Sequence, residues 1–285
     1  MIIALFGNLE IESTLTVALG IREFLVDRGV TLVVEDELAE RLDSRPLSTV
    51  DPQAIDFLLS LGGDGTILRL VHRHPELNAP LVGVNLGHLG FMSDIPLPDL
   101  YPSLTDLLEG NFQLERRVMM EGETAHGDRC FAVNEIVVHR SPNPSLIQLG
   151  IHVQGLYLNT FSADGVIIST PSGSTAYSLA AGGPILTPEL EAFVLTPISP
   201  HTLSNRPMVL GSNHEIQIQY LSDYEPVEVA YDGIQRFTLK TGELFRIRRA
   251  QRQFQLVTFR RRDYFSILRT KLGWSGTLRE YGKSI

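Results

Sequence analysis

The chain has 285 residues, of which 43% are hydrophobic and 20% charged, enough to bury a large core in one large domain or two ordinary ones. Its formal net charge of -9 argues against a general electrostatic hold on nucleic acid or on an anionic membrane, so we expect neither as a partner. The single cysteine, Cys130, excludes an intrachain disulfide and a cysteine cluster for zinc or iron–sulfur.

The N-terminal part, up to about residue 110, alternates short apolar runs with helical patterns. Apolar runs typical of strands covered on both faces occupy Ile2 to Phe6, Val30 to Val34, Phe57 to Leu61 and Leu81 to Val84. Apolar residues recur at helical spacing between these runs, and a further helix is predicted from Pro98 to Gly110. This alternation predicts an α/β domain with a parallel sheet and right-handed crossovers.

After residue 111 the pattern changes to strand-like runs separated by turn pairs, which predicts a mostly antiparallel, β-sandwich-like domain. The predicted strands are Cys130 to Val138, Leu146 to Val153, Leu156 to Phe161, Val166 to Ile168, Glu215 to Tyr220, Val227 to Tyr231 and Phe254 to Phe259. The segment from Tyr264 to Leu272 returns to a helical pattern. We therefore expect an α/β domain over residues 1–110, a β-rich domain over 111–263, and packing of residues 264–285 back on the first.

The N-terminal segment from Met1 to Phe6 has no basic lead-in, which argues against a signal peptide. No apolar stretch in the chain approaches the roughly 20 residues needed to span a bilayer. With the low cysteine content, these features predict a cytoplasmic protein.

The glycine-rich segment Gly62 to Thr66 follows an apolar run and precedes a helical pattern. Closely spaced glycines expose backbone N–H groups at a helix N-terminus, where phosphate is stabilised. The segment is neither a Walker A loop nor a dinucleotide fingerprint, because the lysine and the third glycine are missing. Asp64 would repel phosphate in such a cradle unless it holds a metal or takes a proton. The alternative is that Asp64 is a turn former or helix cap.

Three other segments carry polar groups suited to a nucleotide. Thr170 to Ser178 offers small hydroxyl donors, and Tyr177 offers a ring for a base, although a structural glycine and serine loop explains the same residues. Asn134 and Glu135 can pair with a base edge and a ribose diol, but on a regular strand they point to opposite faces, so one ligand can use both only if the backbone bends. Asp164 lies in a pair, Asp164-Gly165, typical of a hairpin turn.

These segments together resemble one enzyme family. Gly62 to Thr66 is similar to a signature shared by NAD kinases, diacylglycerol and sphingosine kinases, and 6-phosphofructokinases. Asp164 to Ile185 closely resembles the long NAD kinase motif, Asn134-Glu135 resembles the family's short Asn-Glu motif, and Asn85 to Phe91 resembles its loop after the fourth strand. The resemblance runs from the first strand to Gly273-Trp274.

The resemblance implies transfer of the γ-phosphoryl group of ATP to the 2′-hydroxyl of the adenosine ribose of NAD, which yields NADP and ADP. It implies a site between the two domains, Mg²⁺ or another divalent cation brought with ATP, and a homodimer or homotetramer. We assign the catalytic base to Asp64, since a positioned carboxylate can accept the ribose proton as the phosphoryl group transfers. The implied binding residues are Asp64, Gly65, Asn134, Glu135, Asp164, Thr175, Ala176, Tyr177, Ser178, Leu179, Ala180 and Gln235. Arg69 is a further candidate, because it lies five residues after Asp64 on the predicted helix and could reach a phosphate; the alternative is a solvated arginine. No residue is assigned to a protein-only metal site, because no cluster has ligand spacing.

Two alternatives stay open at this stage. A lipid or sugar kinase could share the glycine-rich loop, and a non-catalytic sensor could bind NAD without phosphorylating it. A dehydrogenase is disfavoured by the missing dinucleotide fingerprint.

Overall fold

The computed structural model describes residues 1–8, 12–141, 144–202, 205–259, 261, 263–274 and 276, which form two compact units. Unit 1 comprises Met1–Leu70, Ala79–Leu114 and the chain from Val257 onward. Unit 2 comprises Val71–Asn78 and Glu115–Leu256. Of the segment 264–285 that was predicted to pack on the first domain, residues 275 and 277–285 lie outside the described residues.

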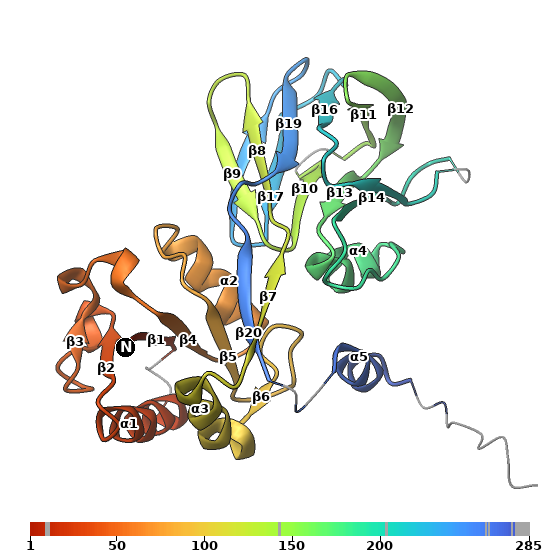
Figure 1. The fold of residues 1–285 in the computed structure, drawn as a ribbon. Helices are drawn as coiled ribbons and strands as arrows, with labels where there is room; N and C mark the ends of the chain where they lie inside the picture. The colour runs from red at the N-terminus through yellow and green to blue at the C-terminus, as the bar shows by residue number, and fades with distance from the viewer. Residues whose placement is uncertain are drawn as a thin grey trace, which may run out of the picture. The chain divides into compact units, whose positions relative to one another are not determined.

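Unit 1 is built on a largely parallel sheet with the strand order β3-β2-β1-β4-β5-β20-β7, and β6 pairs with β5 (Figure 1). Its strands are β1 (Ile2–Gly7), β2 (Thr31–Val34), β3 (Arg45–Pro46), β4 (Phe57–Leu61), β5 (Leu81–Asn85), β6 (Ile95–Pro96), β7 (Gln113–Arg117) and β20 (Phe254–Thr258). Residues of β7 and β20 are divided between unit 1 and unit 2. The pairs among β1 to β6 are parallel. The strand order reverses between β1 and β4, and ligands of open α/β sheets bind outside the carboxyl ends of strands at such a switch point.

Helices cover both faces of this sheet. These helices are α1 (Glu12–Val26), α2 (Asp64–Arg73) and α3 (Leu100–Glu109). Unit 1 also contains α5 (Tyr264–Leu272) and 3₁₀ turns at Asp36–Leu38, Leu47–Thr49, Pro52–Ala54 and Leu97–Asp99. Buried residues of α1 and α3, such as Ile21 and Leu104, share one core cluster with Leu5 of β1 and Val84 of β5. Alternate strand residues face α2, where Ile67 packs close to the backbone of Gly83. Figure 1 shows α1 and α3 on one side of the sheet and α2 on the other.

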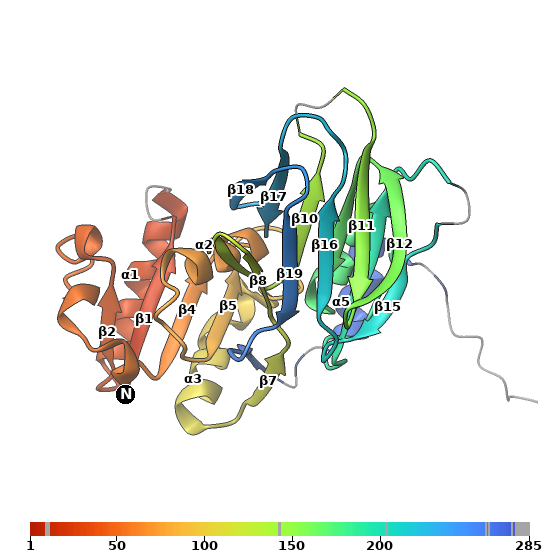
Figure 2. The ribbon, with the colours of Figure 1, turned by 90° about the horizontal axis from the view of Figure 1, so that it is seen from above.

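Unit 2 consists of two antiparallel sheets. One has the order β15-β14-β13-β10-β17-β18 and the other the order β12-β11-β16-β19-β8-β9. The strands of the first are β10 (Glu135–His139), β13 (Gly165–Ser169), β14 (Ala192–Ile198), β15 (Met208–Gly211), β17 (Val227–Tyr231) and β18 (Gln235–Leu239). The strands of the second are β8 (Met120–Thr124), β9 (Arg129–Ala132), β11 (Ile147–Val153), β12 (Leu156–Ala163), β16 (Ile216–Tyr220) and β19 (Leu244–Arg249). Figure 2 shows β12, β11, β16 and β19 side by side.

The two sheets of unit 2 bury one apolar core between them. Ile136 and Phe193 enter it from the first sheet, and Leu149 and Phe245 from the second. Because side chains of a strand alternate between faces, every second residue of these strands belongs to this core and the others point outward. A 3₁₀ turn at Ser172–Thr175 and the short helix α4 (Tyr177–Ala180) follow the carboxyl end of β13.

The predicted fold class, a parallel-sheet α/β part followed by a β-sandwich-like part, is confirmed. The helix predicted from Tyr264 to Leu272 coincides with α5. The single strand predicted from Cys130 to Val138 is wrong: β9 ends at Ala132, β10 begins at Glu135, and a bend separates them. Within the described ranges, no helix is both long and apolar enough to cross a membrane.

Candidate functional site

The glycine-rich loop of unit 1 lies where the sequence predicted it, between the carboxyl end of β4 and the start of α2. Asp64 is the first residue of α2, and its carboxylate accepts hydrogen bonds from a loop outside that helix. Oδ1 accepts hydrogen bonds from the backbone N–H groups of Met92 (3.0 Å) and Ser93 (2.9 Å) and from Ser93 Oγ (3.0 Å). Oδ2 accepts one hydrogen bond, from the N–H of Phe91 at 2.8 Å. The carboxylate therefore anchors a loop 27 to 29 residues further along the chain.

That loop follows β5 and is closed by its own hydrogen bonds. The Asn85 side chain accepts from the N–H of Gly87 at 2.6 Å and donates to the carbonyl of His88. Lys271 of α5 donates to the carbonyl of Leu89 at 2.7 Å. A side chain on Gly90 would collide with the Asp64 carboxylate, so glycine is required for the close approach of this loop. The segment that resembled the family's loop after the fourth strand thus forms the second wall around Asp64.

Gly65 and Arg69, the other unit 1 residues predicted to bind the nucleotide, lie on the first turns of α2. Both are exposed. Arg69 donates to Thr66 Oγ1 at 3.2 Å, within the same helix. The exposed side of the glycine-rich loop and this arginine therefore present N–H and guanidinium donors to solvent, as an anion site requires.

In unit 2 the Asn134-Glu135 pair lies at the bend between β9 and β10. Both side chains are at least nine-tenths buried, and Asn134 Oδ1 and Glu135 Oε2 have no hydrogen-bond partner in the described structure. Burial, and next the charge of Asp232, raise the pKa of Glu135 from 4.5 to about 8, partly offset by a hydrogen bond from the backbone of Tyr177. Unpartnered buried acceptors are costly, and a ligand that donates to them removes that cost.

The Thr170 to Ala180 segment packs against the same bend. The N–H of Thr170 donates to the carbonyl of Asn134 at 2.8 Å, and Thr170 Oγ1 donates to the carbonyl of Val133 at 2.6 Å. Gly173 lies so close to the Asn134 backbone that a side chain there would overlap it. Ser178 is buried and bonded to Thr196, whereas Tyr177 is exposed. The structure thus brings Asn134, Glu135 and the predicted segment Thr175 to Ala180 together.

The two remaining predicted residues lie at different ends of the first sheet. Gln235 begins β18 and accepts a hydrogen bond from Tyr231 at 2.9 Å, and Tyr231 pairs with Ile136 beside Glu135. Asp164 instead precedes β13, whose last residue, Ser169, pairs with Glu135. Asp164 lies five positions before Ser169, about 16 Å along the strand. Asp164 is ion-paired with Arg140 at 2.7 Å, and it connects strands of different sheets, so it is not a hairpin turn.

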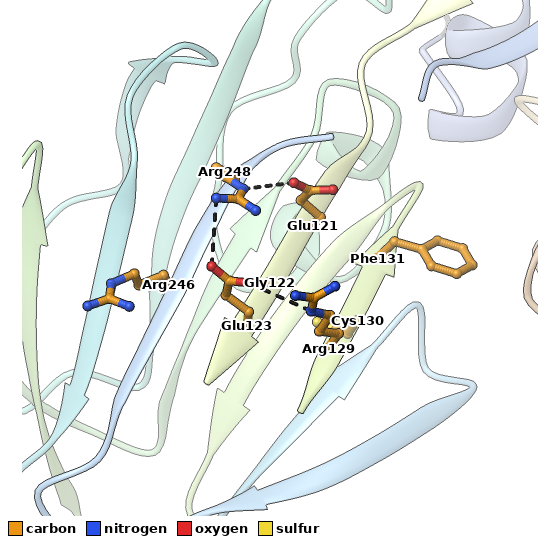
Figure 3. A pocket seen from close by; sticks show the side chains of 8 residues that line it. All are labelled: Glu121, Gly122, Glu123, Arg129, Cys130, Phe131, Arg246 and Arg248. Carbon is orange, nitrogen blue, oxygen red and sulfur yellow. Dashed lines mark hydrogen bonds and ion pairs between the residues drawn. The ribbon is translucent and has the colours of Figure 1, made fainter. Parts of the chain in front are cut away.

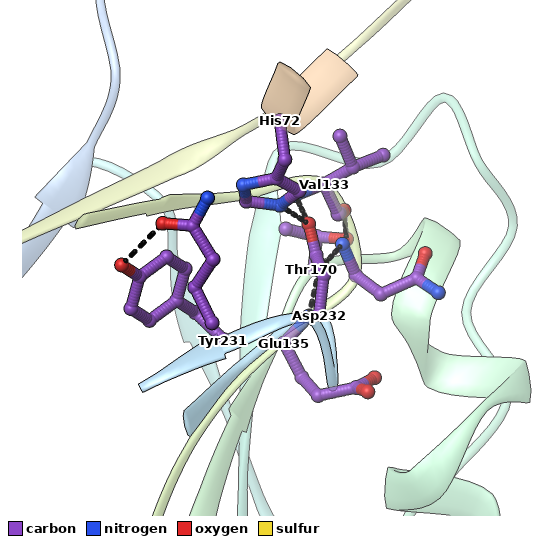
Figure 4. Close-up of polar contacts among 8 residues, drawn as sticks. His72, Val133, Glu135, Thr170, Tyr231 and Asp232 are labelled. Carbon is purple, nitrogen blue, oxygen red and sulfur yellow. Dashed lines mark hydrogen bonds and ion pairs between the residues drawn. The ribbon is translucent and has the colours of Figure 1, made fainter. Parts of the chain in front are cut away.

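Sequence reasoning missed a buried pair next to the Asn134-Glu135 bend. Asp232 and His72 are in contact, with 2.8 Å between His72 Nε2 and Asp232 Oδ2, and both side chains are almost fully buried (Figure 4). Neither residue was assigned a role from the sequence. No local signal joins them, because they are 160 residues apart in the chain.

A separate pocket of about 220 Å³ lies over β8, β9 and β19. Figure 3 shows its charged lining, in which Arg248 pairs with Glu121 at 2.7 Å and with Glu123 at 3.6 Å. Arg129 is also within 3.8 Å of Glu123. None of the residues predicted for the nucleotide site lines this pocket. Its charges are those of cross-strand ion pairs on an outward sheet face.

The two units together contain the parts of a nucleotide-dependent phosphotransferase: a phosphate-type loop with a carboxylate at a switch point, and a buried amide and carboxyl beside a loop of small donors. Residues 3–112 match the ATP-NAD kinase N-terminal domain, and residues 133–259 match the ATP-NAD kinase C-terminal domain. The chain belongs to the ATP-NAD kinase family. It transfers the γ-phosphoryl group of ATP to the 2′-hydroxyl of the adenosine ribose of NAD.

Similar proteins cover nearly the whole chain. The NAD kinase of Protochlamydia amoebophila (strain UWE25) is 57% identical over 277 residues, spanning 97% of this chain and 99% of that protein. The NAD kinase of Geotalea daltonii is 40% identical over 278 residues, with 95% and 98% covered. Yeast NADH kinase complexed with NADH superposes with a TM-score of 0.84 at 27% identity, covering 99% of this chain and 90% of that one. An Archaeoglobus fulgidus NAD kinase in complex with ATP gives a TM-score of 0.76 at 26% identity, covering 97% and 100%.

Proposed function

We propose that Asn134, Glu135 and the segment Thr175 to Ala180 hold the NAD molecule that this kinase phosphorylates. The observation that carries the proposal is the pair of buried acceptors, Asn134 Oδ1 and Glu135 Oε2, which have no partner in the described structure. Base amino groups and ribose hydroxyls are donors that satisfy such atoms. The exposed ring of Tyr177, in the segment whose backbone bonds to Glu135, offers a surface for a base.

Asp164 and Gln235 contact other parts of the dinucleotide in this proposal. Gln235 lies on the same end of the sheet as Glu135, whereas Asp164 lies about 16 Å along the strand. An extended dinucleotide spans such a length, and in a homodimer or homotetramer Asp164 can also reach a dinucleotide held by a neighbouring copy. The strand register therefore supports a role for Asp164 that is separate from that of Glu135.

Asp64 is proposed as the base that accepts the ribose proton. A carboxylate oxygen has two lone pairs, and Oδ1 already accepts from three donors, whereas Oδ2 accepts from one. Oδ2 therefore keeps capacity for the ribose hydroxyl. The four hydrogen bonds fix the carboxylate in place before substrate arrives, which is the positioning that phosphoryl transfer depends on. Gly65 and Arg69 offer donors to the phosphates beside it.

A divalent cation, Mg²⁺ or a similar metal, is proposed to arrive on the phosphates of ATP. Within the described residues no group of three or more His, Cys, Asp or Glu side chains could hold a metal ion, and Asp64 Oδ1 already accepts three hydrogen bonds. A cation of this kind neutralises charge on the transferring phosphoryl group. We further propose that the enzyme works in the cytoplasm, in keeping with a single, buried cysteine.

The binding proposal is tested with Glu135→Ala and Asp164→Ala, measured against Glu121→Ala as a matched control on the outward face of β8. Loss of a hydrogen bond to a charged or strongly polar group is worth about 1.5–3 kcal/mol, so KM for NAD should rise by roughly one to two orders of magnitude in each site variant. Glu121→Ala should leave it unchanged. An unchanged KM for NAD in both site variants would show that Glu135 and Asp164 have only a structural role in the sheet.

A further inference from the structure

The Asp232 carboxylate is the centre of a buried hydrogen-bond cluster directly beneath the Asn134-Glu135 bend. It accepts from three consecutive backbone N–H groups, those of Val133 (2.8 Å), Asn134 (2.7 Å) and Glu135 (3.2 Å). It also contacts His72 Nε2 at 2.8 Å, and the N–H of Asp232 itself donates to the carbonyl of Glu135 at 3.0 Å. Its side chain is 0% exposed, so it cannot touch a ligand.

This arrangement explains why the backbone bends. In a regular strand successive N–H groups point in opposite directions, so three in a row cannot converge on one acceptor. Convergence requires a local concavity of N–H groups, and such a concavity binds an anion. The Asp232 carboxylate is that anion, and the bend it stabilises ends β9 at Ala132 and restarts the chain as β10 at Glu135. The bend is what lets Asn134 and Glu135 serve one ligand.

His72 holds this carboxylate from the other side. It lies in the last turn of α2, and its ring stacks on Phe131 of β9, with centroids 4.5 Å apart and planes at 8°. Figure 4 shows the His72 ring over Asp232, while the Glu135 side chain extends away from it. The stacking sets the orientation of the imidazole, so that Nε2 meets Asp232 Oδ2. With three backbone donors and one imidazole nitrogen, both oxygens of Asp232 are satisfied.

We propose that Asp232 and His72 are positioning residues of this kinase: they set the Asn134-Glu135 bend and thereby the affinity for NAD, without touching it. The inference rests on the proposed binding role of Asn134 and Glu135. The competing explanation is that Asp232 and His72 form a buried polar pair that only stabilises the β-sandwich. In that case, removing the pair would lower NAD affinity no more than any other substitution in unit 2 that causes the same loss of stability.

The variant His72→Phe keeps an aromatic ring against Phe131 but removes the nitrogen that meets Asp232. We expect the dissociation constant for NAD, measured by calorimetry, to rise by tenfold or more, and KM for ATP to stay within a factor of three. His72→Gln places an amide nitrogen near the position of Nε2 and should recover most of the affinity. The control is Ile247→Val, a change in the buried core of the same unit, on β19. Each variant is assayed at the same interval below its own melting temperature.

A second readout is hydrogen exchange at the amides of Val133, Asn134 and Glu135, which should speed up in His72→Phe and not in Ile247→Val. The proposal is overturned if NAD affinity in His72→Phe falls no further than in the control, or if these three amides exchange at the wild-type rate. If His72→Phe does not fold, Asp232→Asn is measured in the same way and decides it. The proposal that Asn134 and Glu135 bind NAD can fail separately. In that case Glu135→Ala would leave NAD affinity unchanged, while the three amides would still exchange faster in His72→Phe.

Discussion

Replacement of Asp64 by asparagine tests the catalytic base most directly. The amide keeps the shape of the side chain, and its oxygen can take the place of Oδ1, which accepts from Met92 and Ser93. Its nitrogen then takes the place of Oδ2 and faces the N–H of Phe91, so that two donors oppose each other. The variant also loses the oxygen that would receive the ribose proton.

Two separate magnitudes follow from this geometry. One unsatisfied N–H costs about 1–3 kcal/mol of stability, and a loss of 2 kcal/mol lowers Tm by roughly 4–8 °C in a protein of this size class. Loss of a general base lowers kcat by roughly 10² to 10⁴. The dissociation constant for NAD should change little, because Asn134, Glu135 and their neighbours are the residues proposed to bind the dinucleotide.

The assay measures kcat, calorimetric NAD affinity and Tm on one preparation of each protein. Ser93→Ala is the matched control, since it removes the 3.0 Å hydrogen bond to Asp64 Oδ1 and loosens the same loop while the carboxylate remains. That control should keep more than about a tenth of kcat. If Asp64→Asn also keeps more than about a tenth, Asp64 is not the base, because even weak base catalysis exceeds that factor. Normal melting with no NAD binding would make Asp64 a substrate anchor instead.

Three further outcomes are expected. Burial and the nearby Asp232 raise the pKa of Glu135 from 4.5 to about 8, so between those pH values the folded protein binds a proton that the unfolded chain has lost, and its stability falls as pH rises. Glu135→Gln should therefore show a flatter decline in urea unfolding between pH 5 and pH 8.5, and identical slopes would refute the assignment. A chelator should abolish turnover reversibly, and dialysis without nucleotide should leave no tightly held metal; full activity in EDTA would contradict this. Gly173→Ala puts a methyl group against the Asn134 backbone, so KM for NAD should rise at least several-fold, with a loss of about 1–3 kcal/mol by chemical denaturation. An unaltered KM would show that the bend tolerates displacement.

The sequence alone determined the parts of this protein that depend on local patterns. The apolar run Phe57 to Leu61, the glycines after it and the helical spacing from Ile67 together placed the phosphate-type loop between β4 and α2. The helix at Tyr264–Leu272 followed from its own helical pattern of residues. The N-terminal part has continuous apolar runs, which predicted the parallel sheet, and the later part has strands separated by turn pairs, which predicted the sandwich. Both predictions were possible because each pattern depends on which faces of a strand are buried.

Only the tertiary structure decided how the polar groups are used. The bend at Val133 and Asn134 interrupts a run that reads as one strand, because it depends on a carboxylate 98 residues away from Asn134. The partners of Asp64 lie 27 to 29 residues along the chain, and the antiparallel register places Asp164 at the far end of a strand from Glu135. A buried carboxylate accepts hydrogen bonds from whichever backbone N–H groups the fold brings within bonding distance. Residue type and spacing in the sequence do not specify which groups those are.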